Sequence, residues 1–279
     1  MAFAQAHGVA HTTFDSTFEL EKIAVHFPSA QVVLRIECDD PNALVPFHGK
    51  FGAQPTEWEA LLEKTKSLGL SLAGVAFHVG SGCTDPHVYH RAMDAAQDVL
   101  HLARKFGFEP HLLDLGGGFS YPLPPAIVAA VRAKADALQA QIPKLTLIAE
   151  PGRYFAETTC VHYTKVVGKR VRGDKREYWI EDGIYGHFAD VGHGYMVATP
   201  LVVAKDDTAP VFESRIYGGT CDGIDVVVPS CVLPDLPVGA WLYFENMGAY
   251  TNALATSFNG IDAAAAPRVY KRAKTKGFV

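Results

Sequence analysis

The chain has 279 residues, 48% of them hydrophobic, which allows one large domain or two of ordinary size with a full apolar core. Its net charge of −5 and the single short basic run at residues 271–276 give a nucleic-acid partner little electrostatic support. The five cysteines are widely spaced and form no C-x-x-C pair, so they indicate a reducing compartment and predict no metal site. Without a basic leader or eighteen uninterrupted apolar residues, we expect a cytoplasmic protein with no membrane contact.

The first half of the chain alternates predicted strands and helices. Apolar strands are expected at 9–14, 31–36, 72–77, 111–115 and 145–149, with helices after Ser16 and at 56–67, 86–106 and 125–141. Continuous apolar strands separated by helices indicate a parallel sheet covered on both faces, and polar residues just past the strand ends indicate the rim of a (β/α) barrel. Five strands cannot close a barrel that needs eight. We therefore predict an α/β fold over residues 1–157, a partial (β/α)8 barrel.

After about residue 158 the pattern changes. Short β segments are expected at 160–167, 177–181, 211–217, 225–228 and 240–245, separated by Gly, Pro and Asp, with no helix of length. This predicts a separate C-terminal β-sandwich domain over residues 158–279.

Two strand ends carry polar loops. The strand that ends at Leu115 runs into Gly116, Gly117 and Gly118, whose backbone N–H groups could cradle a phosphate. A glycine run after a strand is also often only a tight turn. The next strand ends in Glu150–Arg153, which places a carboxylate and a guanidinium beside the glycines. Together the two loops predict a phosphorylated cofactor with a ring.

Five motifs, in this order, resemble the ornithine decarboxylase group of fold-type III pyridoxal-phosphate decarboxylases. They are Phe77-His-Val-Gly-Ser-Gly-Cys-Thr-Asp-Pro86, Leu113-Asp-Leu-Gly-Gly-Gly-Phe119, Ala149-Glu-Pro-Gly-Arg-Tyr154, Gly219-Thr-Cys-Asp-Gly-Ile-Asp225 and Glu245-Asn-Met-Gly-Ala-Tyr250. The resemblance implies an alanine-racemase-like barrel, then a β-sandwich, in a head-to-tail homodimer with two shared active sites. It implies decarboxylation of L-ornithine to putrescine with pyridoxal 5′-phosphate as cofactor.

The resemblance assigns most of the cofactor contacts to the two loops. Glu150 would meet the pyridine nitrogen and keep it protonated, which makes the ring a better electron sink. Arg153 and the amides of Gly116–Gly118 would hold the phosphate, with Pro151 and Gly152 in the same loop.

Four other residues would complete the cofactor site. Ser81 and Tyr250 would add hydroxyls to the phosphate, and His78 would stack on the pyridine face. Arg35, at a strand end on the same rim, would support the cofactor. Taken alone, His78 could equally be a core histidine, and Tyr250 a core tyrosine.

Two neighbouring residues carry the implied chemistry on the substrate. Cys221, facing the other subunit's site, would donate a proton to the carbon that loses CO2. Asp222 would pair with the substrate's distal ammonium group. A lone cysteine is otherwise usually a packing residue.

One departure from the family concerns the substrate. The family has a Tyr-Asp pair soon after a Tyr-Gly-x-Phe segment, but Tyr185–Phe188 is followed here by a loop that places Gly194 at the position of the carboxylate. Asp190 could replace it only if the loop is rearranged. Lysine, arginine or another diamino acid is therefore an alternative substrate.

The second departure concerns the lysine that binds the cofactor covalently. The family carries it in an Ala-Val-Lys-Cys-Asn-like segment on the first barrel strand, and this sequence has no such segment. Six of the seven lysines of the first half lie in or beside predicted helices: Lys22, Lys64, Lys66, Lys105, Lys134 and Lys144. Without the amine the covalent part of catalysis is lost, so we expect this chain as given to be inactive and to belong to a longer gene product or a truncated copy.

A non-catalytic homologue is the alternative from a different class. Such a protein, resembling antizyme inhibitors, would bind an antizyme-like regulator through about residues 1–21. The presence of Cys221, Asp222, Glu150 and Arg153 argues against it, because a protein that only binds a regulator does not need them.

Overall fold

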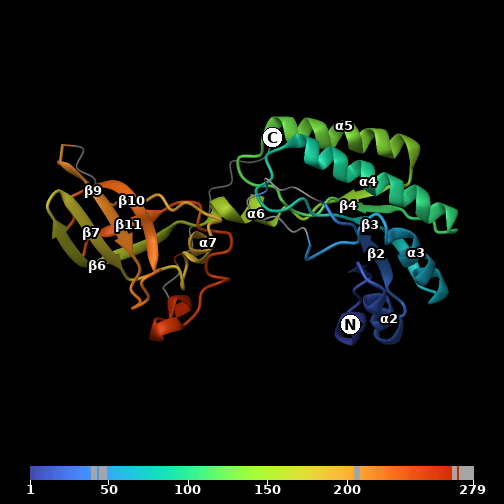
Figure 1. Cartoon of the computed structure of the whole chain (residues 1–279), viewed down its shortest axis with the longest axis horizontal. Coiled ribbons are helices and arrows are strands. Elements are labelled where there is room, and N and C mark those ends of the chain that lie inside the picture. Colours follow the sequence, from blue (N-terminus) through green and yellow to red (C-terminus); the bar gives the residue numbers. More distant parts are fainter. Residues whose placement is uncertain (39–42, 44–48, 204–207, 266–268, 270–279) are drawn as a thin grey trace. The chain divides into compact units, whose positions relative to one another are not determined.

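A computed structural model describes residues 1–38, 43, 49–203, 208–265 and 269 of the chain. The chain divides into two compact units, Met1–Phe155 and Ala156–Val279 (Figure 1). Among the described residues, every helix is too short or too polar to serve as a membrane span.

The first unit contains a five-stranded parallel sheet in which each strand pairs with the next one along the chain. Its strands are β1 (His11–Phe14), β2 (Gln31–Arg35), β3 (Ser71–Ala76), β4 (Leu112–Asp114) and β5 (Thr146–Ile148). Its helices are α1 (Ala2–Ala6), α2 (Thr17–His26), α3 (Trp58–Ser67), α4 (Pro86–Lys105), α5 (Pro125–Gln141) and α6 (Gly152–Ala156). Sequential parallel pairing is the strand order of a (β/α) barrel, so the prediction of a partial barrel is confirmed.

Local signals set the start of two helices. The Ser16 hydroxyl accepts from the Glu19 N–H and caps α2, and the Asp85 carboxylate accepts from the His87 N–H at 2.8 Å and caps α4. The buried residues of α4 recur every three or four positions, from Val88 to Ala103, and form one apolar stripe. This helix contacts both β3 and α5, and α4 and α5 lie side by side in Figure 1.

The sheet is apolar on both faces. Val32 and Leu34 of β2 join the large core under the helices, whereas Val33 between them packs with Ala73, Ala76 and Leu112 in a small cluster on the other face. Side chains alternate between faces along a strand, so Arg35 and Asp114 share the face of this small cluster.

The second unit contains one mixed sheet in the order β10-β9-β7-β6-β11-β8. The strands are β6 (His162–Arg172), β7 (Lys175–Ile180), β8 (Leu201–Val202), β9 (Val211–Tyr217), β10 (Val226–Pro234) and β11 (Trp241–Phe244). The first residues of β6 pair with β11 and the remainder pairs with β7, so β6 joins the two halves into one continuous sheet. A β-sheet domain therefore follows the partial barrel, as the prediction of a C-terminal β-sandwich requires, and its strands form one mixed sheet.

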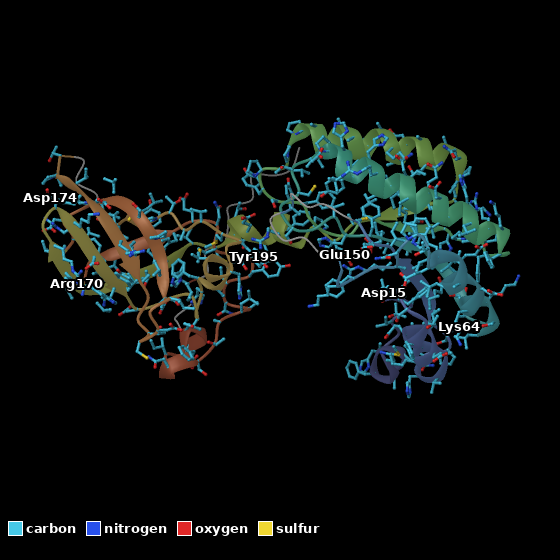
Figure 2. The ribbon with its side chains drawn as sticks, in the orientation of Figure 1. Asp15, Lys64, Glu150, Arg170, Asp174 and Tyr195 are labelled. Atoms are coloured by element: carbon cyan, nitrogen blue, oxygen red, sulfur yellow. The ribbon has the colours of Figure 1, made fainter. Side chains whose placement is uncertain are left out.

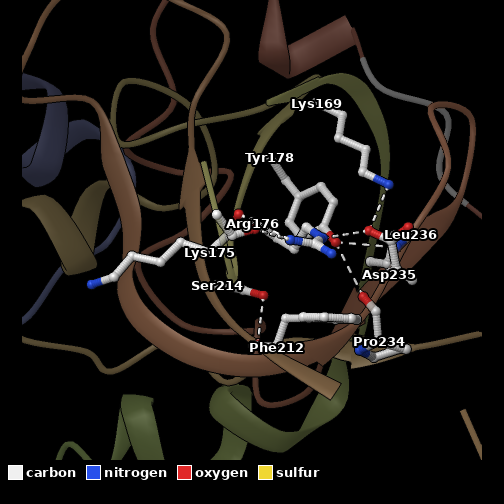
Figure 3. A network of polar contacts seen from close by, with 10 residues as sticks. Lys169, Lys175, Arg176, Tyr178, Phe212, Ser214, Pro234, Asp235 and Leu236 are labelled. Carbon is white, nitrogen blue, oxygen red and sulfur yellow. Dashed lines mark hydrogen bonds and ion pairs between the residues drawn. The ribbon is translucent and has the colours of Figure 1, made fainter. Parts of the chain in front are cut away.

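A polar network fixes the end of β10 in this unit (Figure 3). The buried Tyr178 hydroxyl donates to the Pro234 carbonyl and accepts from the Leu236 N–H, both at 3.1 Å. Asp235 between them accepts from Lys169 at 2.7 Å and from Arg176 at 2.6 Å. The buried hydroxyl is therefore fully hydrogen-bonded, and the end of β10 is held against β6 and β7.

Candidate functional site

Four polar residues lie at the carboxyl ends of neighbouring strands in the first unit. Arg35 ends β2, His78 follows β3 by two residues, Asp114 ends β4, and Glu150, labelled in Figure 2, follows β5 by two residues. The strand ends are level, because Ala76 pairs with both Arg35 and Asp114 and Asp114 pairs with Ile148. The rim of the partial barrel therefore carries one guanidinium, one imidazole and two carboxylates.

Burial and mutual charge set the protonation of this rim. Burial, together with the Arg35 charge, lowers the pKa of His78 to about 4. Burial also raises the pKa of Asp114, against the opposing effects of a backbone hydrogen bond and Arg35. For Glu150 the pKa is raised by burial and by the charge of Asp114, while Arg35 opposes the shift. Arg35 is the cation that offsets both carboxylates.

His78 is neutral and its tautomer is fixed. The Gly80 N–H donates to Nδ1 of His78 at 3.0 Å, so Nδ1 acts as the acceptor and the ring proton lies on Nε2. A half-buried, uncharged imidazole can lie flat against an aromatic ring without a desolvation penalty for charge.

The glycine run packs directly on the segment that carries His78. A Cβ atom at Gly116 would lie 2.0 Å from the Phe77 carbonyl oxygen, and one at Gly117 would lie 2.6 Å from His78 Nε2. At Gly118, with φ of +101°, it would lie 2.5 Å from the Gly80 carbonyl oxygen. Only glycine fits these close approaches.

The glycine amides divide into two kinds, which corrects part of the sequence-based expectation. The Gly116 N–H donates to Asp114 at 2.9 Å, and the Gly116 carbonyl accepts from the Glu150 N–H at 2.8 Å. Gly116 therefore joins the two loops and has no N–H to offer an anion. The N–H groups of Gly117 and Gly118 have no hydrogen-bond partner among the described residues, so these two remain suited to an anion.

The other expected cofactor residues of this unit surround the same loops. Ser81 is half-buried and follows the Gly80 that bonds His78. Pro151 and Arg153 are half-buried in the loop after Glu150, where Gly152 begins α6. The expected residues Tyr250, Cys221 and Asp222 belong to the second unit.

In the second unit, Asp222 is held by a tyrosine. The Tyr185 hydroxyl donates to the Asp222 carboxylate, whose other oxygen accepts from the Ile224 N–H at 3.1 Å. The Tyr185 hydrogen bond lowers the pKa of Asp222 below its usual value. The Phe258 ring packs on Tyr185 with ring centroids 4.3 Å apart. Asp222 is therefore an oriented, ionised carboxylate.

The exposed thiol of Cys221 has a partner of its own, since Sγ donates to the Asn259 side-chain oxygen at 3.4 Å. Sequence reasoning missed Phe258 and Asn259, because no sequence signal links Phe258 to Tyr185, 73 positions earlier, or Asn259 to Cys221, 38 positions earlier. Tyr185 belongs to the Tyr-Gly-x-Phe segment at 185–188, but its contact with Asp222 depends on tertiary structure.

A buried carboxylate joins the two loops around Asp222. Asp225 accepts from the Ile184 N–H at 3.0 Å and from the Thr220 hydroxyl at 2.6 Å. By contrast, Asp190 in α7 (Ala189–Gly192) is only 3% exposed, and Gly194 is exposed with open space around it. Asp190 is therefore buried in the present arrangement of this loop.

Residues 1–157, more than half of the chain, match the family described as "Pyridoxal-dependent decarboxylase, pyridoxal binding domain". The chain belongs to the pyridoxal-dependent decarboxylase family. It is 42% identical over 275 residues to a chloroplastic ornithine decarboxylase of Nicotiana glauca, covering 94% of this chain and 63% of that protein.

Two solved structures of decarboxylases extend the comparison. The arginine decarboxylase of Paramecium bursaria Chlorella virus, bound to agmatine, has a TM-score of 0.89 at 41% identity and covers 94% of this chain and 71% of its own. The lysine/ornithine decarboxylase of Vibrio vulnificus with cadaverine has a TM-score of 0.81 at 27% identity, covering 92% and 69%. The chain spans about 60–63% of the length of the curated relatives it matches.

The rim residues fit the pyridoxal phosphate that this family uses. Two glycine N–H groups without partners suit a phosphate, a neutral His78 suits the face of an aromatic ring, and Glu150 suits a protonated ring nitrogen. Helices α2, α3, α4 and α5 carry Lys22, Lys64, Lys66, Lys105 and Lys134, and Lys144 lies in the turn after α5.

Proposed function

We propose that the protein containing this chain decarboxylates a basic amino acid with pyridoxal phosphate, converting L-ornithine to putrescine. The rim cluster of Arg35, His78, Asp114 and Glu150 beside the glycine loop is the observation that carries the proposal. It lies in the part of the chain that matches the pyridoxal-binding domain.

Residues of the first unit bind and orient the cofactor. When bound, pyridoxal phosphate supplies an electron-accepting ring that allows an amino acid to lose CO2. Gly117, Gly118 and Arg153 hold its phosphate, with Ser81 adding a hydroxyl. The uncharged ring of His78 packs on one face.

Charged residues on the rim then keep the ring nitrogen protonated. Glu150 accepts from the protonated pyridine nitrogen and keeps the proton there. The charge of Arg35 opposes the rise in pKa that burial causes at both Glu150 and Asp114.

Residues of the second unit act on the substrate. Asp222 pairs with the distal cation, Cys221 delivers a proton to the carbon that has lost CO2, and Tyr250 adds a hydroxyl to the phosphate. In the proposed head-to-tail homodimer, Cys221 and Asp222 serve the site of the partner subunit.

The hydrogen bonds of Asp222 favour an ammonium over a guanidinium. One of its oxygens is already bonded to Tyr185 and the other to the Ile224 N–H, so the carboxylate is poorly placed for the two parallel bonds that a guanidinium forms. A point charge such as the ornithine ammonium needs only one contact. This supports ornithine, with lysine as the second substrate to test, ahead of arginine.

The first experiment separates cofactor binding from turnover, because no lysine of this sequence is assigned to covalent attachment. Pyridoxal phosphate is titrated into the chain, and CO2 release from ornithine, lysine and arginine is measured with the protein that contains it. Glu150→Gln should retain cofactor binding and lose activity by about 100-fold or more. Glu109→Gln, at an exposed loop position, is the matched control. Full activity in Glu150→Gln, or no cofactor binding by the chain, would contradict the proposal.

A second experiment tests the shared sites. By this proposal the Glu150→Gln and Cys221→Ala proteins each form little putrescine, but a mixed dimer contains one site with neither substitution. Mixing the two proteins should therefore restore part of the putrescine formation. If the mixture stays as inactive as its components, each site is built from one subunit.

A further inference from the structure

Three side chains of metal-ligand type meet in the second unit, outside the residues assigned to cofactor or substrate. His162 is the first residue of β6, Asp182 follows β7 by two residues, and His187 lies in the loop before α7. One ligand atom from each lies within 4.8 Å of the other two. An oxygen of Asp182 is 3.0 Å from Nε2 of His162 and 2.6 Å from Nδ1 of His187.

The cluster is buried and its carboxylate is held in place. The side chains of His162, Asp182 and His187 are 14%, 8% and 12% exposed. The second oxygen of Asp182 accepts from the Gly183 N–H at 2.7 Å and from the His187 N–H at 3.1 Å. Backbone donors of this kind orient the carboxylate ligands of metal sites.

The contact between His162 and Asp182 is close but poorly aligned for a hydrogen bond. Nε2 of His162 is buried and lies 3.0 Å from an oxygen of Asp182, without the alignment of a hydrogen bond. Groups that hydrogen-bond point at each other, whereas two ligands of one ion both point at the ion. In a tetrahedral site two such ligand atoms lie about 3.3–3.4 Å apart when each is about 2.0–2.1 Å from the ion. Binding of an ion would therefore lengthen the 3.0 Å between Asp182 and His162 and the 2.6 Å between Asp182 and His187 by less than about 1 Å each.

We propose that His162, Asp182 and His187 bind one divalent transition-metal ion, with Zn²⁺ as the fitting example. Two imidazoles and one carboxylate are ligands that zinc accepts, and three protein ligands leave a fourth position open. Mg²⁺ and Ca²⁺ prefer oxygen ligands alone and fit the cluster poorly. The ion connects the start of β6 to the loop that carries Tyr185. The spacing of the three residues matches no short metal motif, because His162 precedes Asp182 by 20 positions and comes near it only in the folded structure.

The test uses the full chain after removal of metal with EDTA. Zn²⁺ is titrated by calorimetry, and Co²⁺ binding is followed by its visible absorption, which reports coordination by nitrogen and oxygen ligands. We expect one Zn²⁺ per chain. His162→Gln and His187→Gln should each weaken binding by about 100-fold or more, since ligand loss costs at least as much as loss of an outer partner. His90→Gln is the control, because His90 forms an exposed pair with Asp94 at 3.3 Å and should leave binding unchanged.

A measurement on the unsubstituted protein covers the case in which a variant does not fold. One equivalent of Zn²⁺ should shift the NMR ring signals of two of the 12 histidines. Shifts spread over the exposed histidines, absence of saturable binding, or binding unchanged in both folded site variants would overturn the proposal.

Discussion

Gly117→Ala tests whether the glycine loop positions His78 for the cofactor. The new Cβ atom would lie 2.6 Å from His78 Nε2 and 3.2 Å from the Glu150 carbonyl oxygen. If the backbone does not shift, the imidazole must move by about 0.8 Å so that Nε2 lies at 3.4 Å, an ordinary contact distance, from the new Cβ atom. Returning the ring to the cofactor face then costs about 1–3 kcal/mol, the usual range for overpacking. This corresponds to pyridoxal phosphate binding that is roughly 5- to 150-fold weaker.

The assay is a titration with pyridoxal phosphate, followed by absorbance, for the original protein, Gly117→Ala, His78→Ala and the double variant. If the clash with His78 is the cause, Gly117→Ala should weaken binding strongly in the original protein and hardly at all once the imidazole is gone. An equal loss in both backgrounds would refute this reasoning and place the effect in the loop backbone.

Three further predictions concern single residues. Burial lowers the pKa of His78 from 6.5 to about 4, so between these pH values the imidazole binds a proton in the unfolded chain but not in the folded protein. The free energy of unfolding should therefore fall by about 2 kcal/mol as the pH drops from 6.5 to 4, and denaturant unfolding of His78→Gln should not show this loss. Tyr185→Phe removes the hydroxyl that orients Asp222 and should raise KM for ornithine roughly threefold to tenfold with a smaller change in kcat, and an unchanged KM would contradict the contact. Cys221→Ala should leave the absorbance of bound cofactor intact while the yield of amine product falls, and loss of that absorbance would rule out its assigned role.

The regular elements were predictable where apolar periodicity is strong. The five strands and four long helices of the first unit follow the pattern of buried residues. The helix at Ala2–Ala6 buries no residue and shows no such pattern, so it was missed. The prediction also ended β6 at Val167, five residues early, because three of the four residues Lys169–Arg172 are charged and their pairing with β7 follows a register shift near Gly168.

The site was predictable at strand ends and hidden where it depends on tertiary contacts. Parallel strands end at one edge, so Arg35, His78 and Glu150, at or just after the ends of apolar runs, were expected at one rim, whereas their roles were inferred from the family resemblance. The sequence does not show that Asp114 occupies the Gly116 amide, because the same motif could leave that N–H facing an anion. The contact of Tyr185 with Asp222 joins residues 37 positions apart and depends on how two loops pack.

The double role of β6 governs how the second unit comes apart. This strand is the only link in the sheet between β11 and β8 on one side and β7, β9 and β10 on the other, as far as the described residues show. Melting of β6 would separate the two sides at once, so neither can remain as a partly folded intermediate held by its own sheet. Backbone amides along β6 should therefore exchange with deuterium only through complete opening of the unit, more slowly than those of the edge strand β8.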